Sequence, residues 1–285
     1  IAFMNNNLLA LHAKSFNWAG FFLPKDIYNK CSILYNFCRT LDDIADDTGD
    51  LEIKKKKFLK FKKNFSNRSI ENPIIKNMWK IIESEKISQK IVYDLFDGVE
   101  SDLSNEVKIN SKKDLLIYSY RVAGTVGLMM AKILRVKKKD SLKSAIDLGI
   151  AMQLTNISRD VIEDSKNNRF YIKNEFEEIS STIYLADSFY KSSFYSIKDI
   201  PISFRFSILV ARRVYRKIGY KILNQKNFEN YQNSGKIYVS NSEKVLETFL
   251  SIFDLIKLSI NYRKDGQIQH DHTLIREEIN LNERF

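Results

Sequence analysis

The hydrophobic positions of this chain recur with the period of helices through most of its length. Residues 51 to 70, for example, place Phe58, Leu59, Phe61 and Phe65 at helical spacing, with lysines between them. Only 9 Gly and 3 Pro interrupt the chain, which favours long helices over a fold with many turns. The pattern predicts helices at 25–47, 51–70, 73–85, 87–103, 113–136, 138–167, 174–198, 202–226 and 241–261.

These helices predict an all-α protein with a single domain over residues 1–285. The sequence has no internal repeat and no clear linker between helices. The tail at residues 263–285 is polar, and we expect it to be loose.

The net charge of +11 has two explanations, codon bias toward lysine or an anionic partner such as a diphosphate or a membrane surface. The lysines are scattered and no nucleic-acid-binding motif accompanies them, so we expect no nucleic-acid partner. Two cysteines, Cys31 and Cys38, do not form a disulfide framework, which favours a reducing cytoplasm. No apolar run approaches the roughly 20 residues that span a bilayer.

One predicted helix ends in a cluster of carboxylates. Asp42, Asp43, Asp46 and Asp47 follow Tyr35 and Arg39, and Asp42 and Asp46 lie one turn apart on one face. These like charges repel one another, and negative charge at a helix C-terminus also opposes the macrodipole. A bound cation would relieve both effects. Oxygen ligands on a rigid element suit Mg²⁺. The alternative is a solvated acidic helix end.

The long apolar helix at 113–136 is interrupted by small residues, Ala123-Gly124-Thr125-Val126-Gly127. Each glycine costs roughly 1 kcal/mol relative to alanine in a helix. Two explanations are open, close packing against another helix or room for a ligand against the backbone.

A second polar stripe closes the next apolar helix. Gln153, Asn156, Asp160 and Asp164 share one face because they are spaced three or four residues apart. Buried charges must be paired or bind a metal, so this stripe indicates either a salt-bridge network with Arg159 or Arg121 or half of a metal site. Together, the two acidic faces suggest two facing helices that bind Mg²⁺ around a diphosphate.

The sequence resembles the squalene/phytoene synthase family of head-to-head prenyltransferases from His12 to about Val245. The resemblance rests on four motifs and the Arg169-Phe-Tyr171 that follows them. The motifs are His12-Ala-Lys-Ser-Phe16, Leu34 to Asp47, Tyr118 to Gly127, and Leu148 to Asp164. The likeness implies the all-α isoprenoid-synthase fold, with helices around a central active-site cavity.

The resemblance also implies roles for individual residues. The expected Mg²⁺ ligands, with Mn²⁺ as an alternative ion, are Asp42, Asp46, Asn156, Asp160 and Asp164. Catalytic or diphosphate-contacting roles are implied for Tyr35, Arg39, Lys14, Tyr118, Gln153 and Tyr215. Substrate contacts are expected from Phe16, Gly20, Ser32, Val122, Ala123, Gly127 and Lys236. Two positions depart from the family: Lys236 stands where arginine is usual and cannot make a fork-shaped phosphate contact, and Ala13 stands where relatives often have serine.

The reaction implied is carotenoid biosynthesis by condensation of two geranylgeranyl diphosphates. It passes through a cyclopropylcarbinyl (prephytoene) diphosphate and ends in proton loss to phytoene. No strand followed by Gly-x-Gly-x-x-Gly is present, so no NADPH is expected. Because the implied substrates and product are hydrophobic, we expect a cytoplasmic enzyme that makes peripheral contact with a membrane.

The C40 product is predicted from side-chain volume. Gly20 and Ser32 are expected to lie close together at the far end of the prenyl tunnel, where bulky residues would stop it short. The alternatives are a C30 synthase acting on farnesyl diphosphate, a terpene cyclase, and a non-catalytic family member acting as an assembly factor. His270 and His272 could suggest a metal site, but we expect them to be solvated.

Overall fold

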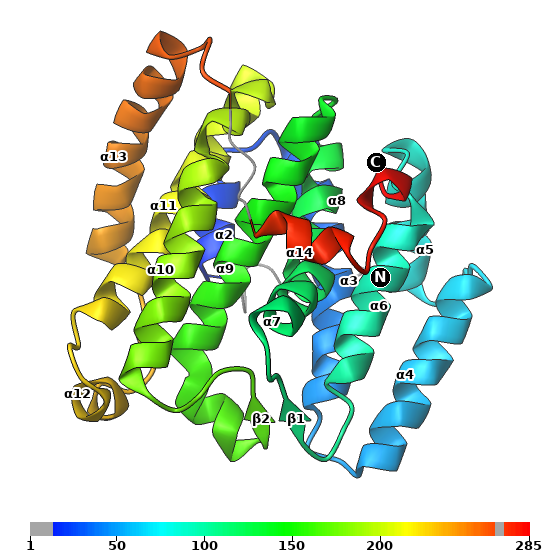
Figure 1. Ribbon diagram of the computed structural model, residues 1–285. Coiled ribbons are helices and arrows are strands. Elements are labelled where there is room, and N and C mark those ends of the chain that lie inside the picture. Colours follow the sequence, from blue (N-terminus) through cyan, green and yellow to red (C-terminus); the bar gives the residue numbers. More distant parts are fainter. Residues whose placement is uncertain (1–13, 266–270) are drawn as a thin grey trace.

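The computed structural model describes residues 14–265 and 271–285 of the chain. His12, His270 and the side chains of Lys14 and Phe16 lie outside this description. The described chain is almost entirely helical, which confirms the predicted fold class (Figure 1).

The first half of the chain supplies the helices on one side of the molecule. These are α2 (Lys14–Gly20), α3 (Lys25–Asp46), α4 (Leu51–Ser66), α5 (Pro73–Ser84), α6 (Gln89–Ser101), α7 (Lys112–Ser119), the π-helical turn η1 (Tyr120–Gly124) and α8 (Thr125–Ile133). The second half continues with α9 (Lys139–Lys166), α10 (Phe176–Ser192), the 3₁₀ helix η2 (Phe194–Asp199), α11 (Ile202–Leu223), α12 (Phe228–Asn233), α13 (Asn241–Ile260), α14 (His272–Arg276) and the 3₁₀ helix η3 (Leu281–Glu283).

Local chemistry sets several of these boundaries. α3 begins directly after Pro24, as predicted, because proline fits the entry to a helix. Before α5, the Asn72 side chain accepts hydrogen bonds from the backbone N–H groups of Ile74 and Ile75. A capping box formed by Ser240 and Glu243 starts α13.

The helix predicted at 113–136 is divided into α7, η1 and α8. Gly127 of α8 packs against α9, and Gly149 of α9 packs against η1. A Cβ on Gly127 would lie 2.3 Å from the Ala145 carbonyl oxygen, and one on Gly149 would lie 2.3 Å from the Ala123 carbonyl oxygen. Close helix packing therefore explains Gly127 and Gly149. The wider π-helical turn lies within this contact.

α9 runs through the middle of the fold, with α8, α10 and α11 packed around it (Figure 1). A second part of the core is aromatic, where Phe37 of α3 meets Phe61 and Phe65 of α4 and Phe96 of α6. Buried apolar side chains from α3 through α14 join one hydrophobic cluster.

Two short strands were not predicted from the sequence. β1 (Val107–Lys108) and β2 (Arg169–Phe170) pair in parallel, with Val107 opposite Arg169. Because β2 follows α9 after only a short turn, the pairing fixes the position of Arg169 next to the C-terminal end of α3.

The prediction of a loose tail is wrong for residues 271–285. Ile275, Ile279 and Leu281 are buried, and Arg284 makes two hydrogen bonds to the Asp94 carboxylate. The prediction of a solvated His272 is also wrong, because its side chain is fully buried, with Nδ1 2.6 Å from Oδ1 of Asp147. The polar average of the tail hides the few apolar residues that attach it to the core.

Candidate active site

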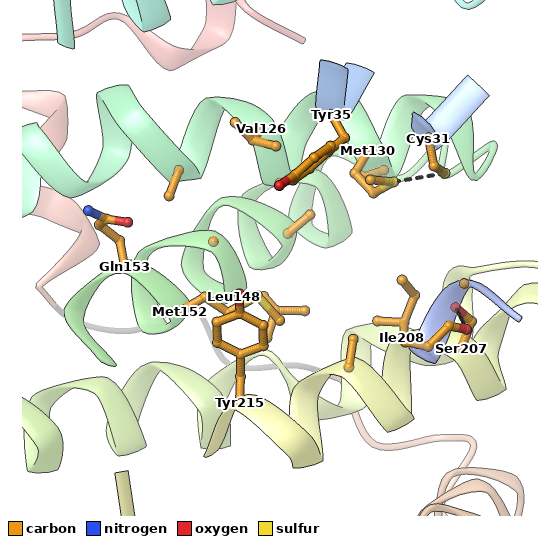
Figure 2. Close-up of a pocket in the computed structure, with 18 of the residues that line it drawn as sticks. Cys31, Tyr35, Val126, Met130, Leu148, Met152, Gln153, Ser207, Ile208 and Tyr215 are labelled. Atoms are coloured by element: carbon orange, nitrogen blue, oxygen red, sulfur yellow. Dashed lines mark hydrogen bonds between the residues drawn. The ribbon is translucent and has the colours of Figure 1, made fainter. Parts of the chain in front are cut away.

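A cavity of about 990 Å³ lies between α3, α8, α9 and α11. One end is polar and includes Arg39, Asp42, Asn156 and Lys236, and the rest is lined mainly by apolar side chains. Figure 2 shows Tyr35 from α3 and Tyr215 from α11 pointing into this space from opposite walls, with Leu148 and Met152 of α9 between them.

Helix α3 carries the first acidic face and places Asp42 at the cavity. The Asp42 side chain is open to the cavity, but the surrounding protein separates it from bulk water. This desolvation raises the pKa of Asp42 to about 7. The negative charge of Asp46 raises it further, and Arg39 offsets part of the effect. Arg39 itself makes an ion pair with Asp43 at 2.7 Å.

The second acidic helix approaches the same end of the cavity. Asp160 receives two hydrogen bonds from Arg159, at 2.8 and 2.6 Å, and lies 3.3 Å from Lys236 Nζ. One turn later, burial and the charge of Asp160 raise the pKa of Asp164 to about 7. The salt-bridge explanation thus holds for Arg159, whereas Arg121 pairs instead with Glu278.

Asn156 offers a buried oxygen atom to the cavity. Its Oδ1 atom is buried and has no hydrogen-bond partner among the described residues, although the residue lines the cavity. A buried carbonyl oxygen without a partner is costly, and a bound cation would satisfy it.

A fifth carboxylate, Asp102 at the end of α6, lies between the two acidic helices and interacts with the charges of Asp42, Asp46 and Asp164. Desolvation raises its pKa, and hydrogen bonds from the Tyr118 and Tyr171 hydroxyls, at 2.9 and 2.8 Å, act in the opposite direction. Sequence reasoning missed Asp102, whose only signal is that an acidic residue stands at the end of an apolar helix.

Cations of the chain itself balance much of this charge. Arg169 pairs with Asp46 at 2.7 Å, while Arg159 and Lys236 surround Asp160. Within residues 14–265 and 271–285, no group of three His, Cys, Asp or Glu side chains is arranged to hold a metal ion by itself. Any ion would therefore need oxygen atoms from a ligand, and the carboxylates would have to exchange their present partners.

Most of the predicted site residues that can be placed line the cavity. These are Gly20, Tyr35, Arg39, Asp42, Val122, Ala123, Gly127, Gln153, Asn156, Tyr215 and Lys236. Asp46, Asp160 and Asp164 lie beside its polar end through the charge interactions above. Tyr118 does not line the cavity; its ring stacks on Tyr171 and its hydroxyl contacts Asp102.

Of the two residues expected at the far end of the prenyl tunnel, Gly20 lines the cavity and Ser32 does not. A Cβ on Gly20 would lie 2.8 Å from the ring of Tyr28, one turn before Ser32 on α3. Ser32 is absent from the cavity lining, and its buried Oγ has no partner among the described residues. The turn between α2 and α3 brings Tyr28, rather than Ser32, against Gly20.

The cavity continues instead along α9 toward its N-terminal end. There the lining includes Ala131, Leu134 and Ala145, which sequence reasoning did not single out. The hydroxyl of Ser141 donates to Asp199 at 2.6 Å, and Ser144 and Ser196 lie 2.8 Å apart, so these polar atoms are satisfied.

The profile of the squalene/phytoene synthase family matches residues 9–176. The chain belongs to this family. It is 28% identical to the 15-cis-phytoene synthase of Pantoea ananas over 77% of this chain and 84% of that protein. It is 33% identical to the 4,4'-diapophytoene synthase of Staphylococcus haemolyticus over 58% of this chain and 61% of that protein.

Solved structures agree with the family assignment. A dehydrosqualene synthase crystallised with a ligand superposes with a TM-score of 0.74 at 25% identity, over 88% of this chain and 94% of that one. The resemblance stated from the sequence motifs is therefore confirmed, and the protein is a member of a family of head-to-head prenyl condensation enzymes.

Proposed function

We propose that the protein condenses two molecules of geranylgeranyl diphosphate head to head, giving phytoene through prephytoene diphosphate in carotenoid biosynthesis. The observation that carries this proposal is the form of the cavity. A charged end, where two acidic helices meet cationic side chains, opens into a long apolar chamber. That combination suits a substrate with a diphosphate head and a prenyl tail.

The length of the chamber supports C20 substrates. Residues of α9 from Ser141 to Asn156 line the whole cavity, its polar end included, which corresponds to about 22 Å of helix at 1.5 Å per residue. Small side chains such as Ala123, Ala145 and Ala211 leave room along the walls for a prenyl chain. The similarity to the Pantoea ananas 15-cis-phytoene synthase, which extends over most of both chains, favours the same product.

A C30 product is the second candidate. The matches to a 4,4'-diapophytoene synthase and to a dehydrosqualene synthase structure favour it. So does the ring of Tyr28, which fills the space beside Gly20.

The residues present fit Mg²⁺, with Mn²⁺ as the alternative. Asp42, Asp46, Asn156, Asp160 and Asp164 would hold the ions together with substrate oxygens. Oδ1 of Asn156, which has no partner among the described residues, favours a bound cation. So do the desolvation and the charges of neighbouring carboxylates that raise the pKa values of Asp42 and Asp164. When bound, the ion supplies Lewis-acid neutralisation of the departing diphosphate.

The chain's own cations bind and orient the two diphosphates at the polar end. Arg39 and Lys236 line it directly, and Lys236 would act as a point charge where arginine would offer a fork. Gln153, which lines the cavity one turn before Asn156, offers an amide to the same end.

The apolar walls protect the carbocations that this reaction requires. Loss of the first diphosphate leaves an allylic cation, and the double bond of the second substrate attacks it. Loss of one proton from the resulting cation closes the ring of the cyclopropylcarbinyl diphosphate. Loss of the second diphosphate, rearrangement and loss of one proton then give phytoene, so no reductant is needed. The faces of Tyr35 and Tyr215 would stabilise positive charge, while Leu148 and Met152 exclude water.

Chain-length selection tests the proposal. Ala145→Phe places a ring partway along the chamber and should lower the preference for the C20 over the C15 substrate roughly tenfold or more by steric exclusion. Ser32→Ala is the matched control outside the lining and should leave the preference unchanged. An unchanged preference in Ala145→Phe would contradict the assignment of this chamber to the prenyl tail.

A further inference from the structure

Helix α13 is amphipathic in the opposite sense from an ordinary surface helix. Four of its five buried residues are polar or charged: Lys244, Glu247, Ser251 and Asp254. The large side chains on its outward side are apolar and exposed. This set, called the α13 face below, comprises Val245, Leu246, Phe249, Ile252, Phe253, Ile256 and Ile260. Phe249 is 61% exposed, Phe253 66% and Ile260 78%.

Specific polar contacts fix this orientation. Arg213 of α11 hydrogen-bonds both carboxylate oxygens of Asp254, at 2.6 and 3.0 Å, and Glu247 at 3.2 Å. At the helix start, Lys221 holds Glu243 at 2.8 Å. Turning the apolar side inward would leave these charges without their partners, so the outward direction of the apolar side chains is built into the fold.

The exposed charge within α13 has one sign. All three acidic residues of α13 take part in the inward ion pairs, and Lys257, whose Nζ lies over the edge of the core at the Phe194 ring, is the only exposed charged residue within the helix. Exposed Arg263 and Lys264 follow its last turn, and the carboxylate of the next residue, Asp265, is paired with Lys198. An apolar face edged by cations matches the boundary between the acyl chains and the headgroups of an anionic bilayer.

The α13 face also begins beside the cavity. Residues Tyr238, Ser240 and Lys244 line the cavity, and the first exposed apolar residue of the face is Val245. In Figure 1, α13 lies at the outer edge of the molecule, where α11 is the helix that packs against it. No helix of the described residues is long and apolar enough to cross a bilayer.

We propose that the α13 face is a bilayer-docking surface that lies in the headgroup region of an anionic membrane. A second copy of the chain is the less favoured occupant, because a symmetric contact would bring cations together without any carboxylate on the outward side to balance them. The surface itself is independent of the substrate. Its role in passing prenyl chains from the bilayer to the cavity rests on the proposed function.

Vesicle flotation with the full chain tests this surface without any substrate. The parent should float with vesicles of phosphatidylglycerol and phosphatidylcholine, and more weakly with phosphatidylcholine alone. The double variant Phe249→Glu and Phe253→Glu should bind the anionic vesicles at least about tenfold more weakly. The matched control, Ile53→Glu and Leu59→Glu on α4, adds the same charge to exposed apolar positions on the other side of the molecule and should bind like the parent.

Each other outcome overturns the proposal. A parent that binds neither kind of vesicle, or an α13 double variant that binds like the parent, removes the membrane assignment. If light scattering shows that the parent is a dimer and the α13 variant a monomer, and the parent does not bind vesicles, the α13 face contacts a second copy of the chain.

The experiment also separates the surface from the reaction. With substrate dispersed in detergent, the α13 variant should keep parental turnover, and with substrate supplied in vesicles its turnover should fall. Absence of turnover by the parent in detergent would contradict the proposed function and leave the flotation result standing.

Discussion

Arg169 donates a hydrogen bond to the Asp46 carboxylate at 2.7 Å, although the two residues lie 123 positions apart. The contact joins the C-terminal end of α3 to β2, the short strand that follows α9. It shows that the two carboxylate-bearing faces meet in one site, and that a guanidinium from the chain neutralises one of them.

Catalysis should require a carboxylate from each acidic helix. Asp42→Ala and Asp160→Ala should each lower the rate of diphosphate release at least about a hundredfold, since even outer-shell changes at metal sites cost 10–100-fold. Asp47→Ala is the control, because Asp47 ends the same acidic stretch but pairs with Lys57 at the surface. Near-parental release by either active-site variant in the presence of Mg²⁺ would exclude the proposed role.

The stability of the metal-free protein should depend on pH through Asp42 and Asp164. Both have pKa values raised from 3.8 to about 7, so the folded protein binds more protons than the unfolded chain between these values. The contribution of these groups to stability therefore falls as pH rises from about 4 through 7. Melting temperatures measured in a chelator should show this slope, and it should be shallower in Asp42→Asn. A slope identical to that of the parent would rule Asp42 out as its source.

Mg²⁺ and diphosphate should reverse that trend. Because metal ligands must be deprotonated, the gain in melting temperature from Mg²⁺ with inorganic diphosphate should grow between pH 6 and pH 8. Thermal shifts measured with each component alone provide the control. Equal shifts from diphosphate with and without Mg²⁺ would show that the two do not bind as a unit.

Asp102 should tune the two titrating carboxylates. Its charge contributes to the raised pKa values of Asp42 and Asp164, so Asp102→Asn should move the acidic limb of the pH–rate profile toward lower pH. Tyr118→Phe keeps the charge of Asp102 and removes the hydrogen bonds of the Tyr118 hydroxyl to Asp102 and Tyr171, so it should not produce that shift. A profile unchanged in Asp102→Asn would mean that Asp102 is electrostatically remote from the reaction.

Gly149→Ala should destabilise the fold by roughly 2 kcal/mol or more. The added Cβ would lie 2.3 Å from the Ala123 carbonyl oxygen, so α9 and η1 would have to separate. Gly49→Ala meets only ordinary contacts at 3.8 Å and beyond, and should change the free energy of unfolding by about 0.5 kcal/mol or less. Urea denaturation of both variants measures the difference.

Local patterns were enough to predict most of the helices and the acidic stripes. The start of α3 after Pro24 and the stacking of Asn156, Asp160 and Asp164 follow from helical spacing alone. Family motifs then identified the residues that line the polar end of the cavity.

Features that depend on contacts between distant segments could not be predicted in this way. The place of Asp102 depends on how α6 packs against α3 and η1, and that of Arg169 depends on the pairing of β2 with β1. The burial of His272 depends on Asp147, 125 residues earlier. The position of Ser32 outside the cavity lining and the contact of Tyr28 with Gly20 likewise depend on how α2 meets α3.

Product identification tests the central proposal most directly. The purified protein should be incubated with Mg²⁺ and either geranylgeranyl or farnesyl diphosphate, and the hydrocarbons separated and identified by mass spectrometry. The account predicts phytoene from the C20 substrate, formed in preference to any C30 product and without NADPH. A C30 hydrocarbon or presqualene diphosphate as the dominant product, or no hydrocarbon from the C20 substrate, would contradict it.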